Sequence, residues 1–146
     1  MSNIHSGFTL VELLLTISIF AIIAVAAFPV SRAFQIRSNL DIAAATVAEA
    51  VRRAETLARG MDGDSQWGIY AAANSITLFR GSSYAVRNVS FDEVSPMPSG
   101  IILPGVAELR FVKLTGFPTS AVALTITSAD NETRTVTVND KGMVAY

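Results

Sequence analysis

Residues 13–30, LLLTISIFAIIAVAAFPV, form an uncharged stretch of eighteen residues, and this stretch constrains the fold more than any other part of the chain. Together with the residues from Phe8 onward, it would form a helix roughly 34 Å long, enough for a bilayer core of about 30 Å. We therefore expect residues 8–30 to cross a membrane once. Pro29 lies near the end of this segment, and we expect it to kink the helix because proline lacks an N–H and clashes with the preceding turn.

A single carboxylate, that of Glu12, lies near the start of this apolar region. An ionised side chain at the centre of a bilayer costs about 2.5 to 3.5 kcal/mol on insertion scales. Because something must offset that cost, we expect Glu12 to have a partner. The preceding residues, MSNIHSG, lack the basic start of an ordinary secretory signal, and no clear cleavage site follows the apolar run.

Residues 31–60 continue the helix with a different pattern. Apolar residues recur at spacings of three and four, which is typical of an amphipathic helix. No loop signal separates this stretch from the apolar one, so we predict one helix over residues 8–59, with Gly60 as a natural stop. The alanine-rich face permits close approach of a sheet or of another helix. This face comprises Ile36, Leu40, Ala43, Val47, Ala50, Ala54 and Leu57.

From residue 61 onward the periodicity becomes that of strands separated by turn residues. Residues 92–105 hold three of the five prolines and are predicted to be a crossing loop. The predicted fold is α+β, with a long N-terminal helix packed on a mostly antiparallel β-sheet. Strands are predicted at residues 67–73, 76–80, 84–91, 106–114, 121–127, 133–139 and 142–146. The core between sheet and helix is expected to contain Trp67, Tyr70, Phe79, Phe91, Phe111 and Phe117.

The composition excludes several kinds of chemistry. The chain has no cysteine, which removes disulfides, thiolate metal sites and thiol nucleophiles. From Arg32 onward, eleven basic residues balance eleven acidic ones, so no strong field attracts nucleic acid over long range. The stretch DGDS, residues 62–65, offers oxygen ligands but lacks the pattern of a calcium loop, and a solvated turn is the preferred interpretation. We predict no catalytic residues, no metal and no cofactor, and hence no enzyme.

The stretch SGFTLVELLLTISIFAIIAVAAFP resembles the class III leader and N-terminal helix of type IV pilins and type II secretion pseudopilins. Gly7 matches the residue before the scissile bond and Phe8 the new N-terminus. Residues 9–11 match the usual spacer, Glu12 the acidic residue and Pro29 the helix-breaking proline. The likeness is strict over about the first thirty residues, and the order of helix and sheet extends it over the whole chain as a pilin-like fold.

The resemblance implies a series of processing and assembly steps. Prepilin peptidase would cleave between Gly7 and Phe8, and Phe8 would then be N-methylated. The mature chain would reside in the inner membrane with its sheet outside, and an assembly platform would extract it from the lipid bilayer into a filament of pilin or pseudopilin subunits. The resemblance also supplies a partner for Glu12, namely the α-amino group of Phe8 on a neighbouring subunit. His5, the only histidine, would leave with the leader, so the mature chain would have no histidine for general-base or metal chemistry.

The chain is thus divided into a leader (1–7), a membrane and filament-core half of the helix (8–30), an amphipathic half (31–60) and an extracytoplasmic sheet domain (61–146). We expect a structural subunit of a type IV pilus or type II secretion filament. The missing cysteines favour a minor pilin or pseudopilin, and the region from the amphipathic helix to the first two strands resembles the H-type minor pseudopilin and FimT group.

Two alternatives stay open. The leader carries no Lys or Arg, and the positive-inside rule taken alone would place it outside the cell; we follow the motif instead. A tip-located or membrane-held minor pilin could also act as a binding module for DNA, a surface or a secretion substrate. A basic strand face made by Arg80, Arg87, Arg110 and Lys113 would serve DNA, although scattered solvated charge is the simpler interpretation.

Overall fold

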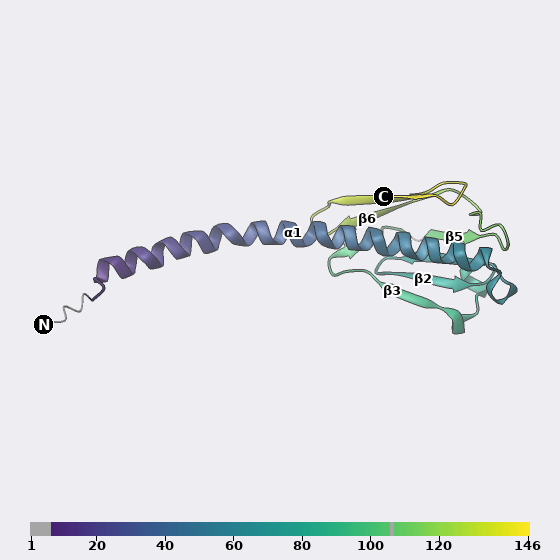
Figure 1. The fold of residues 1–146 in the computed structure, drawn as a ribbon, viewed down its shortest axis with the longest axis horizontal. Helices are drawn as coiled ribbons and strands as arrows, with labels where there is room; N and C mark the ends of the chain where they lie inside the picture. Colours follow the sequence, from purple (N-terminus) through teal and green to yellow (C-terminus); the bar gives the residue numbers. More distant parts are fainter. Residues whose placement is uncertain (1–6, 106) are drawn as a thin grey trace, which may run out of the picture. The chain divides into compact units, whose positions relative to one another are not determined.

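The computed structural model describes residues 7–105 and 107–146, and among these the side chains of all but residues 26–30. Its first element is a single helix, α1 (Leu10–Arg59), which begins within two residues of the predicted start and ends where predicted (Figure 1). The chain divides into two compact units, Met1–Gln35 and Ile36–Tyr146. We call them the N-terminal unit and the sheet unit and describe each by itself.

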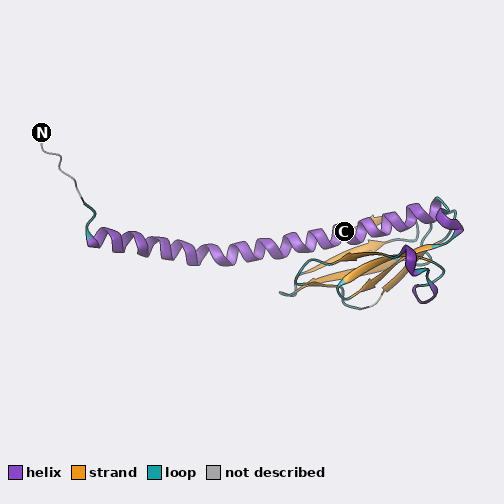
Figure 2. Ribbon diagram, turned by 90° about the horizontal axis from the view of Figure 1, so that it is seen from below, coloured by secondary structure: helices purple, strands orange, loops and turns teal. Residues whose placement is uncertain are grey.

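The amphipathic part of α1 forms one wall of the core of the sheet unit. Five of the seven residues predicted for its apolar face are buried, and Ile36 and Leu57 pack partly buried against them. The buried face is wider than predicted, because it also includes Ala44, Ala48, Val51 and Ala58. A wide face suits this helix because it packs against two sheets rather than one. In Figure 2 most of the strands lie along one side of α1.

The first sheet has the strand order β3-β2-β1-β5 and lies along one flank of α1. Each neighbouring pair is antiparallel, and the register aligns Leu109, Ile69 and Leu78 across three strands. These three side chains are buried and belong to the same core as the helix. Its strands are β1 (Trp67–Ala72), β2 (Ser75–Arg80), β3 (Glu93–Pro96) and β5 (Ala107–Phe111).

The second sheet, of strand order β4-β6-β7-β8, is also antiparallel throughout its pairings. It completes the core with Leu124, Ile126, Val136 and Val138. The predicted α+β fold is therefore confirmed, with two antiparallel sheets in place of the single one expected. The strands are β4 (Ile101–Ile102), β6 (Val122–Ser128), β7 (Thr133–Val138) and β8 (Val144–Ala145).

Ion pairs tie α1 to both sheets at the rim of the core. Asp41 accepts a hydrogen bond from Arg134 of β7 at 3.1 Å, and Arg53 donates to Glu93 of β3 at 2.7 Å. In Figure 1, β6 lies on one side of α1, whereas β2 and β3 lie on the other. These pairs are exposed and add little stability.

The predicted strand at residues 84–91 is wrong. The segment instead forms two short 3-10 helices, η2 (Tyr84–Val86) and η3 (Val89–Phe91), that cross the first sheet on the face turned away from α1. The Tyr84 ring stacks on Tyr70 of β1 with centroids 3.7 Å apart, and the Arg87 guanidinium lies 3.7 Å from the Tyr84 ring centroid. Stacking onto the sheet and a cation–π contact thus replace strand pairing.

The predicted crossing loop at residues 92–105 is wrong in part, because it contains β3 and β4. Pro96 is compatible with β3 because it is the last residue of an edge strand, where no partner needs its missing N–H. A third 3-10 turn, η1 (Asp62–Asp64), follows α1, and the left-handed residue there is Met61 rather than Gly60.

The predicted aromatic core between sheet and helix is right for two residues of six, Trp67 and Phe111, which are buried in it. Phe79 is also buried, but it lies on the face of the first sheet turned away from α1, so its predicted place is wrong. Tyr70 is half-buried on that same face. Phe91 and Phe117 remain 41% and 46% exposed, so their predicted place in the core is wrong.

Candidate processing and assembly site

The bond between Gly7 and Phe8 lies just before the start of α1, where the backbone is not yet helical. A methyl group placed on Gly7 would find no atom within 4 Å, and the Phe8 side chain is 79% exposed. A peptidase needs to reach both sides of the bond that it cleaves. The local geometry leaves this bond accessible in the described part of the chain.

Thr9 caps the first turn of α1. Its hydroxyl oxygen accepts a hydrogen bond from the Glu12 backbone N–H at 3.2 Å, and its carbonyl accepts one from the Leu13 N–H at 3.1 Å. A threonine followed three residues later by a glutamate is the sequence signature of a helix start. Sequence reasoning missed this signal because it treated Glu12 only as a charge in an apolar run.

This cap places Glu12 in the first turn of the helix. Unpaired N–H groups there carry partial positive charge, which favours a nearby carboxylate by about 0.3 to 1 kcal/mol at an exposed position. That gain is smaller than the cost of about 2.5 to 3.5 kcal/mol for a charge in hydrocarbon. If Glu12 lay in hydrocarbon, the helix end would thus offset only part of that cost.

The other polar side chains in this stretch are satisfied by the helix itself. The Thr16 hydroxyl donates to the Leu13 carbonyl at 2.9 Å, and the Ser18 hydroxyl donates to the Leu14 carbonyl at 2.7 Å. Such bonds let hydroxyl side chains lie in apolar surroundings without an external partner. Glu12 is the one charged residue between Phe8 and Val25 in the sequence.

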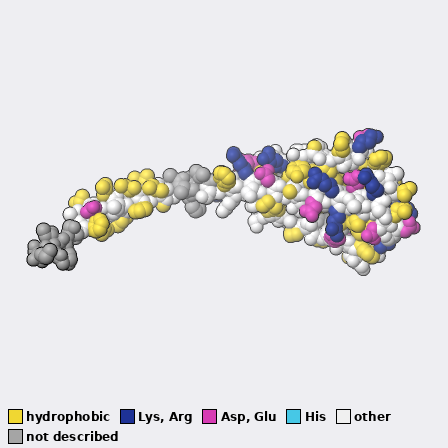
Figure 3. Space-filling model, in the orientation of Figure 1, with side chains coloured by type: hydrophobic (Ala, Val, Ile, Leu, Met, Phe, Trp, Pro, Cys, Tyr) yellow, Lys and Arg dark blue, Asp and Glu magenta, His cyan; other side chains and the backbone are white. Residues whose placement is uncertain are grey.

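Apolar side chains cover the described part of the N-terminal unit, as Figure 3 shows. An uncovered apolar surface of this extent marks a contact with lipid or with protein. Within the residues that the structure describes, no helix is both long enough and apolar enough to qualify as a membrane span. Side chains that are at least 70% exposed include those of Phe8, Leu10, Val11, Phe20, Ile22 and Val25.

A comparison with protein families bears on this region. Residues 3–28 match the family model described as the prokaryotic N-terminal methylation motif. The chain carries a class III prepilin leader. Such a leader is that of type IV pilin-like and pseudopilin substrates of prepilin peptidase, and the match confirms the resemblance seen in the sequence. Neither the comparison with curated proteins nor that with solved structures gives a match.

The roles of individual residues stay predictions. Gly7, Phe8 and Glu12 lie within the matched range, and the described geometry brings Phe8 and Glu12 to the same end of α1. The predicted kink at Pro29 falls on a residue whose side chain is outside the described set. The predicted membrane crossing of residues 8–30 includes residues 26–30, whose side chains are outside the described set, so it also stays a prediction.

The basic residues weighed for DNA binding are each engaged within the sheet unit. Lys113 donates to the Asp64 carboxylate at 2.6 Å, and this hydrogen bond, with the Coulombic attraction, lowers the pKa of Asp64. Arg87 donates to Asp92 at 2.8 Å, and that bond raises the pKa of Arg87. The DNA-binding alternative stays a prediction to which these contacts add no support. The other two residues, Arg80 and Arg110, donate to backbone carbonyls.

The acidic turn weighed for calcium lies beside these cations. Asp64 of that turn is paired with Lys113, and the Arg80 guanidinium packs against Gly63. Among the described residues, no group of three or more His, Cys, Asp or Glu side chains could hold a metal ion.

Proposed function

We propose that this chain is a structural subunit, of the minor pilin or pseudopilin kind, of a type IV pilus or type II secretion-like filament. Prepilin peptidase cleaves it between Gly7 and Phe8, and Phe8 is then N-methylated. Residues 8–30 hold the mature chain in the inner membrane, with the sheet unit on the extracytoplasmic side, until the assembly platform moves it into the filament. The kinship with the H-type and FimT group remains a prediction within this proposal.

One observation carries the proposal: an exposed apolar helix start that contains the methylation motif and a single carboxylate. Cleavage would give Phe8 a free α-amino group, four positions before Glu12 in the sequence. In an apolar filament core, this cation on one subunit pairs with Glu12 on its neighbour. A close pair at low effective dielectric gains several kcal/mol, which offsets desolvation only in the correct register. Glu12 therefore sets the stagger between subunits, whereas apolar packing supplies most of the affinity.

The test is Glu12→Ala in the cells that make the protein. Cleavage should continue, so the mature chain should begin at Phe8 by mass spectrometry, while filaments sheared from the cells should lose the subunit. A matched control moves the acid by one position, Glu12→Leu with Leu13→Glu, which keeps the composition but turns the carboxylate by about 100° around the helix. Normal incorporation of either variant would refute the role of Glu12. A chain that still begins at Met1 would refute the processing.

A further inference from the structure

Two of the three tyrosines of the chain lie face to face on the first sheet. Tyr70 of β1 and Tyr84 of η2 are stacked, with ring centroids 3.7 Å apart and ring planes 4° from parallel. Both residues are half-buried. We call residues 84–91, which carry Tyr84 across the face of the sheet turned away from α1, the strap. Because nearly parallel rings at this separation touch across their faces, ring carbons of Tyr70 and Tyr84 are in van der Waals contact.

The neighbours of Tyr84 hold it in this position. Since Tyr70 covers one face of the Tyr84 ring, the Arg87 guanidinium, 3.7 Å from the ring centroid, lies over the other face. Arg87 is itself fixed, because it donates hydrogen bonds to the Tyr84 carbonyl and to the Asp92 carboxylate, each 2.8 Å long. The Phe79 ring meets Tyr84 edge-on, with centroids 5.6 Å apart. Among the described residues, Tyr70 is therefore the phenol in contact with Tyr84.

Two phenols in contact can be joined by oxidation. A one-electron oxidant takes an electron from one phenol, whose proton passes to water, and leaves a radical with spin on the ring carbons next to the oxygen. A second oxidation makes the partner a radical as well, and a carbon–carbon bond forms between two such carbons. The hydrogen of each joined carbon then moves to the oxygen, which restores both phenols. With hydrogen peroxide as the oxidant, the two electrons and two protons reduce it to two waters.

We propose that Tyr70 and Tyr84 form a site of oxidative cross-linking, at which a haem peroxidase with hydrogen peroxide joins the strap to β1 as a dityrosine. Contact between the rings makes the coupling intramolecular, so it is faster than coupling between molecules. The third tyrosine, Tyr146, is 61% exposed and lines a depression on α1, so the first sheet separates it from this pair. A chain without cysteine cannot close its strap with a disulfide, and the dityrosine is a covalent closure of another kind.

Digestion with trypsin allows a direct test, because cuts after Arg59, Arg80 and Arg87 place the two tyrosines on different peptides. The full-length protein in mild detergent is treated with a haem peroxidase and hydrogen peroxide, digested and analysed by mass spectrometry. The expected product is residues 60–80 joined to residues 81–87, with a mass two hydrogen atoms below the sum of the two peptides. Absence of this product from the oxidised protein would overturn the proposal.

The matched control combines Tyr84→Phe with Val86→Tyr, which keeps three tyrosines and the same tryptic peptides. Val86 is 70% exposed on the same 3-10 helix, so the moved phenol faces solvent instead of Tyr70. The yield of the joined peptides should fall at least about tenfold in this variant. An equal yield would overturn the proposal, as would a parent product joined mainly through residues 142–146, which contain Tyr146.

The fit of the cross-link to the native stack is tested by unfolding. A link that forms without displacing the strap closes a loop between residues 70 and 84 and thereby constrains the unfolded chain. The urea midpoint of the cross-linked protein, followed by circular dichroism, should rise by about 1 M. Peroxidase-treated Tyr84→Phe protein, which undergoes other oxidation without this link, gives the reference. A midpoint no higher than the reference would overturn the proposed site, because the strap would then have to leave the sheet to react.

Discussion

Gly68 of β1 lies on the face of the first sheet turned away from α1, directly opposite Phe79 of β2. A Cβ atom on Gly68 would lie 2.7 Å from Phe79 Cζ and 2.8 Å from the Leu109 carbonyl oxygen. The Phe79 ring is fully buried, and the Leu109 oxygen belongs to the backbone of the paired strand β5. Neither neighbour can give way without moving a strand, so Gly68→Ala should disturb the whole first sheet.

The cost of Gly68→Ala follows from these two clashes. Forcing an extra methyl group into a packed interior typically costs about 1 to 3 kcal/mol, and we expect about 3 kcal/mol because one clash is with backbone. With a urea dependence of about 2 kcal/mol per molar, the unfolding midpoint should fall by about 1.5 M. The assay is the fluorescence of Trp67, the only tryptophan, which is 4% exposed and adjacent to the substituted residue.

The matched control is Gly60→Ala. Both variants and the parent are measured as full chains in one mild detergent. Its Cβ would lie 3.3 Å from the Thr56 carbonyl oxygen, just after the end of α1, and φ at Gly60 is not in the left-handed region. We expect its midpoint to stay close to that of the parent chain. A Gly68→Ala midpoint within about 0.2 M of the parent would refute the reasoning, because the strands would then have absorbed both clashes at little cost.

Two further predictions concern single side chains. Because the pKa of Asp64 is lowered in the folded state from 3.8, its pair with Lys113 contributes stability at higher pH that is lost as the pH falls through the folded pKa. Urea midpoints at about pH 6 and about pH 3 should therefore differ less for Asp64→Asn than for the parent chain, and an equal difference would count against the pair. Thr9→Ala removes the hydroxyl that accepts from the Glu12 N–H, which should cost the helix start about 1 kcal/mol and speed amide exchange at Glu12 about fivefold. Thr9→Ser should exchange like the parent, and unchanged exchange in Thr9→Ala would contradict the cap.

The parts of the fold that depend on local periodicity could be predicted from the sequence. Leu40, Val47 and Ala54 follow the helical repeat, and each is buried as expected. The full width of the buried face could not be predicted, because it depends on the presence of two sheets. The spacing of apolar residues along a helix does not indicate how many sheets will pack against it.

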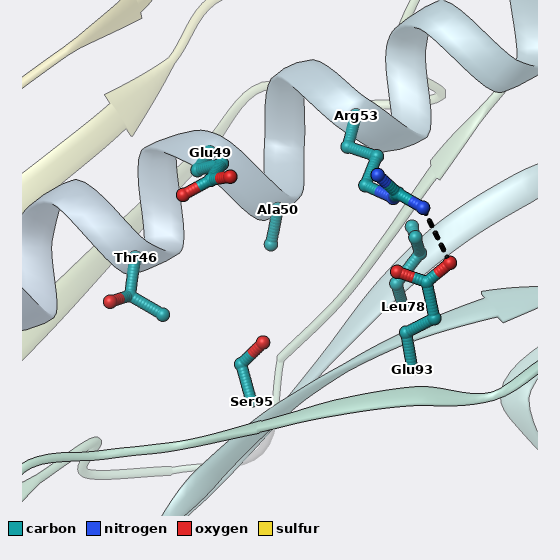
Figure 4. A pocket seen from close by; sticks show the side chains of 7 residues that line it. All are labelled: Thr46, Glu49, Ala50, Arg53, Leu78, Glu93 and Ser95. Atoms are coloured by element: carbon teal, nitrogen blue, oxygen red, sulfur yellow. Dashed lines mark hydrogen bonds and ion pairs between the residues drawn. The ribbon is translucent and has the colours of Figure 1, made fainter.

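The strap at residues 84–91 shows where such patterns fail. YAVRNVSF alternates much as a strand does, yet Tyr84 and Arg87 stack on the first sheet instead of extending it. Tyr70, on which this stack rests, is fourteen positions from Tyr84 in the sequence, and its role depends on tertiary placement. The pairing of Arg53 with Glu93 (Figure 4) cannot be predicted from the sequence for the same reason.

The candidate site was more accessible to sequence reasoning than the strap. Gly7, Phe8 and Glu12 stand at fixed spacing in a short stretch, and no tertiary contact is needed to recognise them. The cap by Thr9 could also have been predicted, since its pattern is local. The sequence could not predict which charged residues of the sheet unit pair with one another, such as Arg53 with Glu93.

The burial of α1 between two sheets has a consequence for biosynthesis. Its Ala-rich face leaves the ribosome before any strand exists to cover it, and the second sheet cannot close over Val47 and Val51 until residues 101–145 have followed. Such distant pairings form slowly, and an uncovered apolar face is prone to aggregation during the delay. If the residues before that face anchored the nascent chain in lipid, they would keep it apart from other nascent chains during this interval. Such an anchor would also protect the chain from aggregation.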